Sequence, residues 1–324
     1  MLRTTLKAAA LCIMLPAAAG AADADWTKVA DALGKSGAEM AGGVYRVGLP
    51  RTDLHVKLDG VDIKPALALG SWLAFKGKGD VAMVMGDLVL TEDEVEPVMK
   101  KLTESGIEIT ALHNHLLRAQ PATLYMHVLG HGDPAKLATA LHDGLALSKT
   151  PLGNATASAS PEAFIPGSEQ PARTGPATAS SQGPAAGSNQ PPRLDLDTAM
   201  IDKALGAKGK AVGGVYQVGL PRAETIKDGG MEVPVAMGTA EAINFQPTGG
   251  GKAAITGDFV LTAKEVNPVL HALRENGIEV TAVHNHMLDD EPRLFFMHFW
   301  ANDDAAKLAK GLRAALDKVN VARS

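Results

Sequence analysis

Cysteine is almost absent from this sequence. The single cysteine, Cys12, lies inside an apolar segment near the start of the chain. If that segment is removed, the rest of the protein has no disulfide, no thiolate metal site and no cysteine nucleophile. Any bound metal must therefore be held by His, Asp, Glu or Met.

Basic runs and long apolar runs are also missing. The formal net charge is −5, and lysines and arginines form no cluster. These features argue against nucleic acid and against a polybasic membrane patch. Beyond residue 22, no stretch is apolar enough for a membrane-spanning helix. We therefore expect no nucleic-acid partner and no membrane span, and a partner would be a small molecule or an envelope component.

The N-terminus, in contrast, has the pattern of an export signal. Arg3 and Lys7 precede an apolar stretch over residues 11–19, and small residues follow at 19–22. This pattern predicts a signal peptide over residues 1–22 and a periplasmic or secreted protein. Cys12 comes before the apolar stretch ends, so it does not form a lipobox.

The clearest feature of the remaining chain is an internal repeat. GGVYRVGLPR at 42–51 returns as GGVYQVGLPR at 213–222, and GDLVLT at 86–91 returns as GDFVLT at 257–262. GIEITALHNH at 106–115 likewise returns as GIEVTAVHNH at 277–286, and each pair is separated by 171 positions. The repeat predicts two homologous domains, over 26–147 and 194–320.

The segment between the copies, residues 148–193, is rich in Pro, Ala, Ser, Thr and Gly. Such a composition buries too little apolar surface to offset its ordering entropy, so it predicts a flexible linker. The two copies are then either separate units or halves packed about a pseudo-twofold axis. The sequence leaves both arrangements open.

Each copy has the periodicity of an α+β domain. In the first copy a short helix over 26–33 leads to a strand over 44–49 and further strands within 54–75. A buried strand over 81–90 ends at a capping box, Thr91-Glu92-Asp93-Glu94, which starts a helix that stops at Gly106. Strands over 107–117 and 124–129 and a helix after Asp133 complete a β-α-β-β-α order. We expect an antiparallel sheet with helices packed on one face.

Histidines form the candidate site. His113 and His115 alternate along a strand and therefore share one face. A hairpin centred near residue 120 or 121 places His127 opposite one of them, on the same face. Three imidazole nitrogens can then converge on one ion at about 2.0–2.1 Å. The second copy repeats the set with His284, His286 and His298.

Two interpretations of these histidines compete. Ile107, Ile109 and Ala111 share the face of His113, which is then a core face, so the histidines could be neutral groups of a structural polar core. The metal interpretation is favoured because three neutral imidazoles need donors and acceptors that the sequence does not supply. Six of the ten histidines occur in both copies, whereas the other four occur in one copy only. Zinc is the first choice, and copper or nickel would also accept imidazole.

Four carboxylates recur at the junction of strand and helix. They are candidates for a general acid or base, or for a fourth metal ligand. The two glutamates also complete capping boxes, which is the simpler interpretation of their position. The four residues are Asp87, Asp258, Glu94 and Glu265.

These strings resemble the LppY/LpqO family, a group of exported proteins also known as DUF1259. The resemblance covers residues 26–147 and 194–317 and is carried by GGVYRVGLPR, GDLVLTEDEVEPVM, ALHNHLL and VHNHMLDDEPRLFFMHFW. It implies two tandem family domains but brings no defined activity. The family's namesakes are lipoproteins, and this chain departs from them because it lacks a lipobox.

The site itself is similar to that of α-acetolactate decarboxylase and the PPC-type domains. In those families an HxH strand is also followed by a third His, and the decarboxylase uses the three for zinc. They carry Gly-Gly before the third His, where this chain has Tyr125-Met126 and Phe296-Met297. The likeness implies zinc and a metal-dependent lyase, while a hydrolase is equally open. The alternative is a non-catalytic envelope module that binds a ligand.

Overall fold

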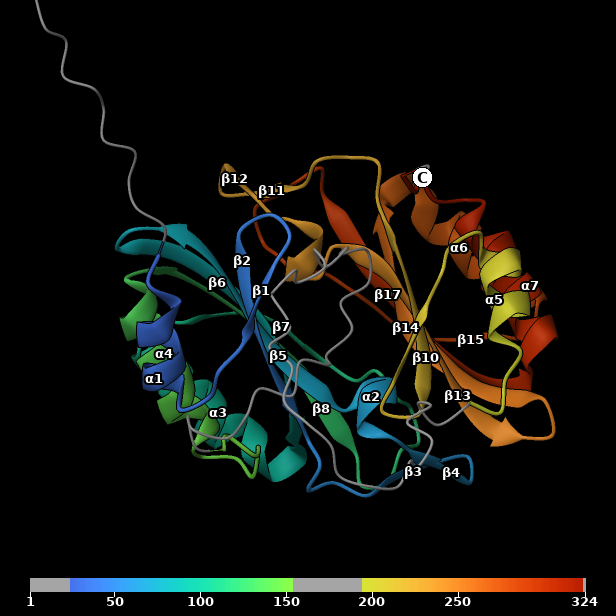
Figure 1. The fold of residues 1–324 in the computed structure, drawn as a ribbon, viewed down its shortest axis with the longest axis horizontal. Helices are drawn as coiled ribbons and strands as arrows, with labels where there is room; N and C mark the ends of the chain where they lie inside the picture. The colour runs from blue at the N-terminus through green and yellow to red at the C-terminus, as the bar shows by residue number, and fades with distance from the viewer. Residues whose placement is uncertain (1–23, 154–193, 323–324) are drawn as a thin grey trace, which may run out of the picture.

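The computed structural model describes residues 24–153 and 194–322. The predicted signal peptide and most of the predicted linker lie outside the described residues. Within the described ranges, no helix is both long and apolar enough to cross a membrane. The described residues form two similar halves, each a six-stranded antiparallel sheet with helices on its outer face (Figure 1).

The first half corresponds to the first copy of the repeat. Its sheet has the strand order β1-β2-β5-β6-β8-β7. The segment β6-α3-β7-β8-α4 confirms the predicted β-α-β-β-α order. The elements are α1 (Trp26–Leu33), β1 (Ala38–Met40), β2 (Val44–Pro50), β3 (Val56–Leu58), β4 (Val61–Ile63), α2 (Pro65–Ala68), β5 (Gly70–Lys78), β6 (Val81–Thr91), α3 (Glu92–Glu104), β7 (Glu108–His113), β8 (Thr123–Gly132) and α4 (Pro134–Leu145).

The second half repeats this plan. Its main sheet has the order β15-β17-β14-β13-β10-β9, and a small sheet adds β12-β11-β16. The elements are α5 (Thr198–Leu205), β9 (Lys210–Val212), β10 (Val215–Pro221), β11 (Lys227–Asp228), β12 (Met231–Glu232), the short 3-10 helix η1 (Val235–Met237), β13 (Ala240–Gly249), β14 (Lys252–Thr262), α6 (Ala263–Glu275), β15 (Glu279–His284), β16 (Asp290–Glu291), β17 (Leu294–Asp304) and α7 (Ala305–Leu316).

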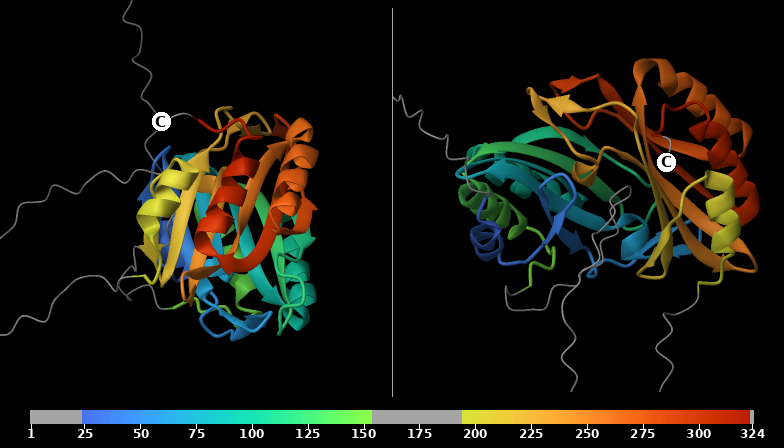
Figure 2. Two further views of the ribbon diagram at one scale, coloured as in Figure 1. Left: turned by 90° about the vertical axis from the view of Figure 1, so that its right-hand side faces the viewer. Right: turned by 45° about the horizontal axis from the view of Figure 1, so that its top comes forward.

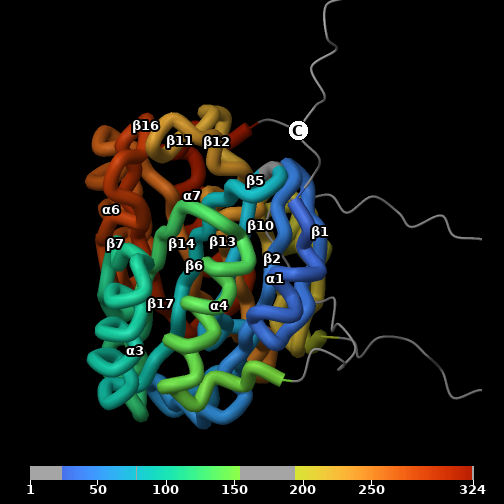
Figure 3. Tube along the Cα trace, turned by 90° about the vertical axis from the view of Figure 1, so that its left-hand side faces the viewer, coloured from blue at the N-terminus to red at the C-terminus, as the bar shows by residue number. Residues whose placement is uncertain are grey.

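The helices begin where the sequence predicts. Thr91 and Glu94 form a complete capping box at the start of α3, and Thr262 and Glu265 form its twin at α6. Each box satisfies backbone N–H groups that the first helical turn leaves without partners. The helices cover one face of each sheet, with α1, α3 and α4 in front of the first sheet in Figure 3 and α5, α6 and α7 in front of the second in Figure 2.

The two sheets meet through their inner faces. Each half has its own apolar core between sheet and helices. Two further clusters combine side chains of both halves: one joins Met85 and Leu129 to Phe296, and the other joins Leu116 and Tyr125 to Trp300. The molecule is thus a helix–sheet–sheet–helix sandwich (Figures 1 and 2). Of the two arrangements that the sequence left open, the structure has the face-to-face one.

The register of the hairpin formed by β7 and β8 differs from both predicted alternatives. Ala111 lies opposite His127, and His113 lies opposite Tyr125. The strand β7 also ends at His113, so His115 lies in the loop that follows. The predicted pairing of His127 with His113 or His115 is therefore wrong, although His113 and His127 keep the same parity.

A β-bulge at Thr110 explains the faces of this strand. The register shifts between Ile109 and Ala111, so two residues of β7 oppose one of β8. Ile109 consequently packs into the helix-side core with Val128. The prediction that Ile107 and Ile109 share the face of His113 is wrong because that prediction assumed a straight strand. The second half has the same shift, between Val280 and Ala282.

Candidate metal centre

All six repeated histidines gather where the two sheets meet. The three closest ring pairs across the halves are His113 with His284 at 3.5 Å between centroids, His115 with His298 at 3.5 Å, and His127 with His286 at 3.7 Å. His113 and His284 are equivalent residues of the two repeats. Exchanging the halves converts the pair of His115 and His298 into the pair of His286 and His127. The histidines thus lie about a pseudo-twofold axis that passes between His113 and His284.

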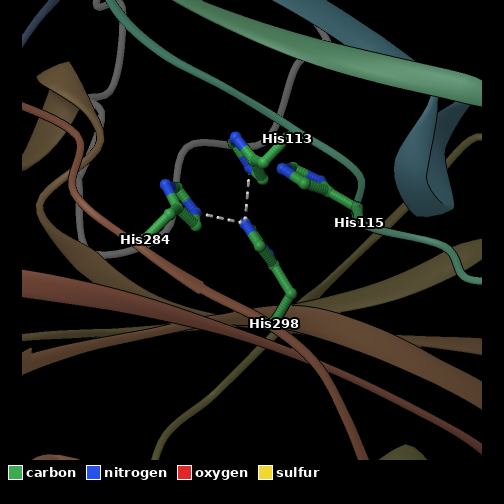
Figure 4. A group of neighbouring side chains, drawn as sticks. All are labelled: His113, His115, His284 and His298. Carbon is green, nitrogen blue, oxygen red and sulfur yellow. Dashed lines mark hydrogen bonds between the residues drawn. The ribbon is translucent and has the colours of Figure 1, made fainter.

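Four of these rings bring one nitrogen each into the same small region. His113, His115, His284 and His298 offer ligand atoms that all lie within 4.8 Å of one another (Figure 4). His298 Nε2 is 2.8 Å from His284 Nε2 and 3.3 Å from His113 Nε2. Nitrogens that share a tetrahedral zinc at about 2.0–2.1 Å stand roughly 3.3 Å apart. We call these four residues the histidine tetrad.

The tetrad changes the predicted grouping. The sequence predicts one trio in each repeat, whereas the structure brings together two histidines from each repeat. His127 falls in a second group, with His115 and Asp87, whose ligand atoms also lie within 4.8 Å of one another. His286 belongs to neither group, although its ring packs against His127.

The candidate Asp87 is placed by the sheet itself. Asp87 on β6 lies directly opposite His127 on β8, and Asp258 on β14 lies opposite His298 on β17. Asp258 Oδ1 is 2.9 Å from His298 Nδ1, and Asp87 Oδ1 is 3.8 Å from His127 Nδ1. Both aspartates of the predicted candidate set therefore border the histidines.

Burial favours the neutral form of five of these imidazoles. Desolvation, followed by the neighbouring imidazoles, lowers the pKa of His113, His115 and His127 far below the usual value. Desolvation, reinforced by neighbouring histidines, lowers the pKa of His284 to about 4 and that of His286 to about 3. A neutral imidazole has a free lone pair, which is the form that binds metal.

Comparison with known proteins identifies the repeats. A domain family described as a Domain of Unknown Function (DUF1259) matches residues 27–147 and again 199–318. The chain belongs to the DUF1259 family. It carries two tandem copies of the domain, as the sequence predicts. No curated protein matches the chain.

Two solved structures show a weak likeness to the tandem DUF1259 chain. A trimeric bacterial microcompartment shell protein, PduB, is 10% identical, covers 87% of this chain and 91% of its own, and has a TM-score of 0.19. EtuB from Clostridium kluyveri is 8% identical, covers 86% of this chain and 90% of its own, and has a TM-score of 0.18. Scores this low establish no shared fold.

Several buried polar atoms of the DUF1259 centre have no hydrogen-bond partner. They are both ring nitrogens of His127 and of His286, together with His115 Nε2, His113 Nδ1, Asp87 Oδ1 and Asp258 Oδ1. Each unsatisfied buried polar group costs about 1–3 kcal/mol. His298 and His284 are different, because their Nδ1 atoms contact the carbonyl oxygens of Gly257 and Asn285 at 3.0 and 2.7 Å.

Three aromatic side chains border the centre, although the sequence motifs of the site do not include them. Tyr125 stacks on His115 at 3.4 Å between centroids, and Phe296 packs against His286 at 4.2 Å. Trp72 meets His286 edge-on at 6.3 Å. Tyr125 and Phe296 are found two positions before the third histidine of their DUF1259 repeats, so strand parity alone places them on the histidine face.

Glu94 and Glu265 lie in separate networks. Glu94 Oε2 accepts a hydrogen bond from the buried Arg51 at 2.7 Å, and Glu265 Oε2 is 2.9 Å from Arg222. Both carboxylates also complete the capping boxes described above. Neither belongs to the two groups that gather around the histidines.

Proposed function

We propose that this protein binds one divalent metal ion, with zinc as the first choice, at the histidine tetrad, and that the ion fastens the two repeats together. The observation that carries this proposal is the convergence of four imidazole nitrogens, two from each repeat, within 4.8 Å. A ligand set divided between two packed halves makes metal binding and docking of the halves a single event.

The chemistry of the donors selects the class of metal. Imidazole suits zinc, copper and nickel, whereas magnesium and calcium prefer oxygen ligands. Four protein ligands also close the shell of a tetrahedral zinc, as in structural zinc sites. Catalytic zinc sites keep one position open. The tetrad therefore favours a structural or storage role over a lyase or hydrolase.

A second candidate function is a non-catalytic module in which the histidines form a polar core. A chain of contacts in the second half favours it, since Asp258 meets His298, and His298 meets His284 at 2.8 Å. This interpretation leaves both nitrogens of His127 and His286 without partners. A metal accounts for more of the buried nitrogen atoms, so we rank it first.

Elemental analysis tests the proposal. We expect protein purified from its native compartment to carry zinc or another imidazole-binding divalent metal, and zinc added to apo-protein to raise its melting temperature. His298→Ala removes the tetrad nitrogen that contacts two others, so it should lose one equivalent of metal. His271→Ala, on α6, is the matched control and should keep it. Less than a tenth of a metal per chain, with no thermal shift on adding zinc or copper, would contradict metal binding.

We also propose that the protein is exported to the periplasm or secreted, supported by the sequence of residues 1–22. Mass spectrometry of the purified protein should give a mature chain that begins near Ala22 or Asp23 in the periplasmic or secreted fraction. A full-length chain in the cytoplasm would contradict export.

A further inference from the structure

The second group of ligand atoms points to a second metal position. We propose that Asp87, His127 and His115 bind a second divalent ion, so that the centre is dinuclear and His115 serves both ions. This inference rests on the proposed function, because it adds a position beside the histidine tetrad. His115 is the one residue that belongs to both groups.

The spacing of Asp87 and His127 fits an ion between them. Asp87 Oδ1 is 3.8 Å from His127 Nδ1, and neither atom has a hydrogen-bond partner. Oxygen and nitrogen atoms that share a tetrahedral zinc, each at about 2.0–2.2 Å, stand roughly 3.4 Å apart. The distance is thus too long for a direct hydrogen bond and close to that of two ligands of one ion.

Burial makes the missing partner costly. Asp87 is 7% exposed and His127 is 2% exposed. A buried carboxylate is stable only when it is paired or bound to a metal. Arg46 acts on Asp87 electrostatically, but its guanidinium donates to the carbonyl of Ala236 and lies over the ring of Trp72, so the two side chains form no ion pair.

The two halves differ at this place, so among the described residues only one such group of ligand atoms forms. The equivalent pair is Asp258 and His298, and their closest atoms are 2.9 Å apart. Asp258 and His298 thus contact each other directly, whereas Asp87 and His127 stand 3.8 Å apart. His298 also directs its Nε2 into the tetrad. The symmetric counterpart of the second position therefore holds a direct contact between aspartate and histidine.

His115 can serve both positions because imidazole has two ring nitrogens. When both bind metal, the ring gives its N–H proton to solvent and bridges the ions as an imidazolate. The second position then has three protein ligands, which leaves a coordination place for water or a small anion. His286 stands beside it, with its ring 3.7 Å from that of His127 and both of its nitrogens without partners.

Metal stoichiometry tests the second position. Apo-protein is titrated with zinc and analysed for bound metal after desalting. We expect two equivalents in the wild type and one in Asp87→Asn and in His127→Ala. Asp143→Asn, on α4, is the matched control, because Asp143 is exposed and pairs with Lys101, and it should keep two equivalents. Asp258→Asn, the symmetry partner of Asp87→Asn, is titrated alongside.

The outcomes separate the two proposals. No bound zinc in the wild type overturns both of them. One equivalent in the wild type, unchanged in Asp87→Asn, overturns the second position and leaves the tetrad standing. Loss of one equivalent in Asp258→Asn but not in Asp87→Asn overturns the assignment of Asp87.

A spectroscopic test needs no variant, so it does not depend on whether variants fold. Cobalt(II) is added to wild-type apo-protein, and its paramagnetic resonance signal is followed. Two ions that share His115 should couple magnetically, so the signal of the first equivalent should fall as the second binds. Signals that simply add would mean that the ions are far apart and would overturn the shared centre.

Discussion

At the scale of single residues, Asp87 and Asp258 show how equivalent positions have diverged. Burial raises the pKa of Asp87 well above its ordinary value, and repulsion from Asp258 adds to the effect. Burial also acts on Asp258, but the adjacent His298 outweighs it and holds the pKa of Asp258 below the ordinary value. The repeat predicts that both aspartates matter. It cannot predict their opposite pKa shifts, which depend on the spatial neighbours of each carboxyl group.

The Arg51–Glu94 pair gives a prediction for pH dependence. Burial raises the pKa of Glu94, but hydrogen bonds from Arg51 and from the N–H groups of Thr91 and Lys149 lower it more, so the folded pKa lies below the ordinary value. Its contribution to stability is therefore complete above the unfolded pKa of about 4.3 and is lost as the pH falls through the folded pKa.

We expect Glu94→Gln to lower the free energy of unfolding by about 3 kcal/mol at pH 7, because it leaves a buried guanidinium with one carboxylate fewer. The difference from wild type should shrink below pH 4, where wild-type Glu94 also becomes neutral. Urea denaturation at several pH values measures this. A difference that stays constant down to pH 3 would show that the charge of Glu94 is not its source.

The twin substitution, Glu265→Gln, serves as a comparison. Arg222 keeps Glu224 at 3.0 Å and Glu241 at 3.8 Å, whereas Arg51 keeps only Asp53 within ion-pair distance. The loss at pH 7 should therefore be smaller for Glu265→Gln than for Glu94→Gln. An equal or larger loss would mean that the added carboxylates do not compensate.

At the scale of elements, the capping boxes and the strand parity of the histidines could be predicted, because both depend on local sequence. The register of β7 could not. At the bulge, the hydroxyl of Thr110 donates to the carbonyl of His286 and its own carbonyl accepts from Asn285, and both partners belong to the other half. The same bulge forms at Thr281, whose hydroxyl has no hydrogen-bond partner, so this contact is not the cause of the bulge. The bulge turns Ile109 toward the helices while His113 stays at the centre, and strand alternation alone does not reveal such a shift.

Gly257 on β14 gives a prediction at this scale. A Cβ atom there would lie far inside van der Waals contact with the carbonyl oxygen of Ala242 on the neighbouring strand β13. Because that oxygen is backbone, the strands would have to separate beside Asp258. We expect Gly257→Ala to cost about 3 kcal/mol or more of unfolding free energy, as measured by urea denaturation.

Gly70→Ala is the matched control. Gly70 also lies in a strand, but the nearest atom to an added Cβ is the Pro65 carbonyl oxygen at 3.9 Å. Its effect should stay within about 1 kcal/mol. Similar costs at the two positions would show that close packing of β13 and β14 is not the reason.

At the scale of the whole molecule, the halves are joined by more than the histidines. Arg118 forms paired hydrogen bonds with Glu279 at 2.8 and 2.9 Å, and Gln246 of the second half donates to the carbonyl of Asp62 in the first. Two apolar clusters shared by the halves flank these contacts. The sequence predicts the two domains but not this interface, because no local pattern records which faces of two sheets will meet.

This interface predicts that the connection between the repeats is dispensable once the protein has folded. A protease site introduced within residues 154–193 should allow cutting without separation of the halves. Size-exclusion chromatography with light scattering should give the mass of the uncut protein. Bound zinc should raise the urea concentration at which the cut halves separate. Two peaks of half the mass in native buffer, with zinc present, would contradict the prediction.

The contact of His113 with His284 on the pseudo-twofold axis has a consequence for the origin of the chain. A lone repeat contains half of the tetrad, so it completes the site only by pairing with an identical copy. Fusion of two such copies in one gene makes their pairing intramolecular, so completion of the site no longer depends on protein concentration. It also frees each half from symmetry. The first copy has Arg46 where the second has Gln217, and this difference is a trace of that freedom.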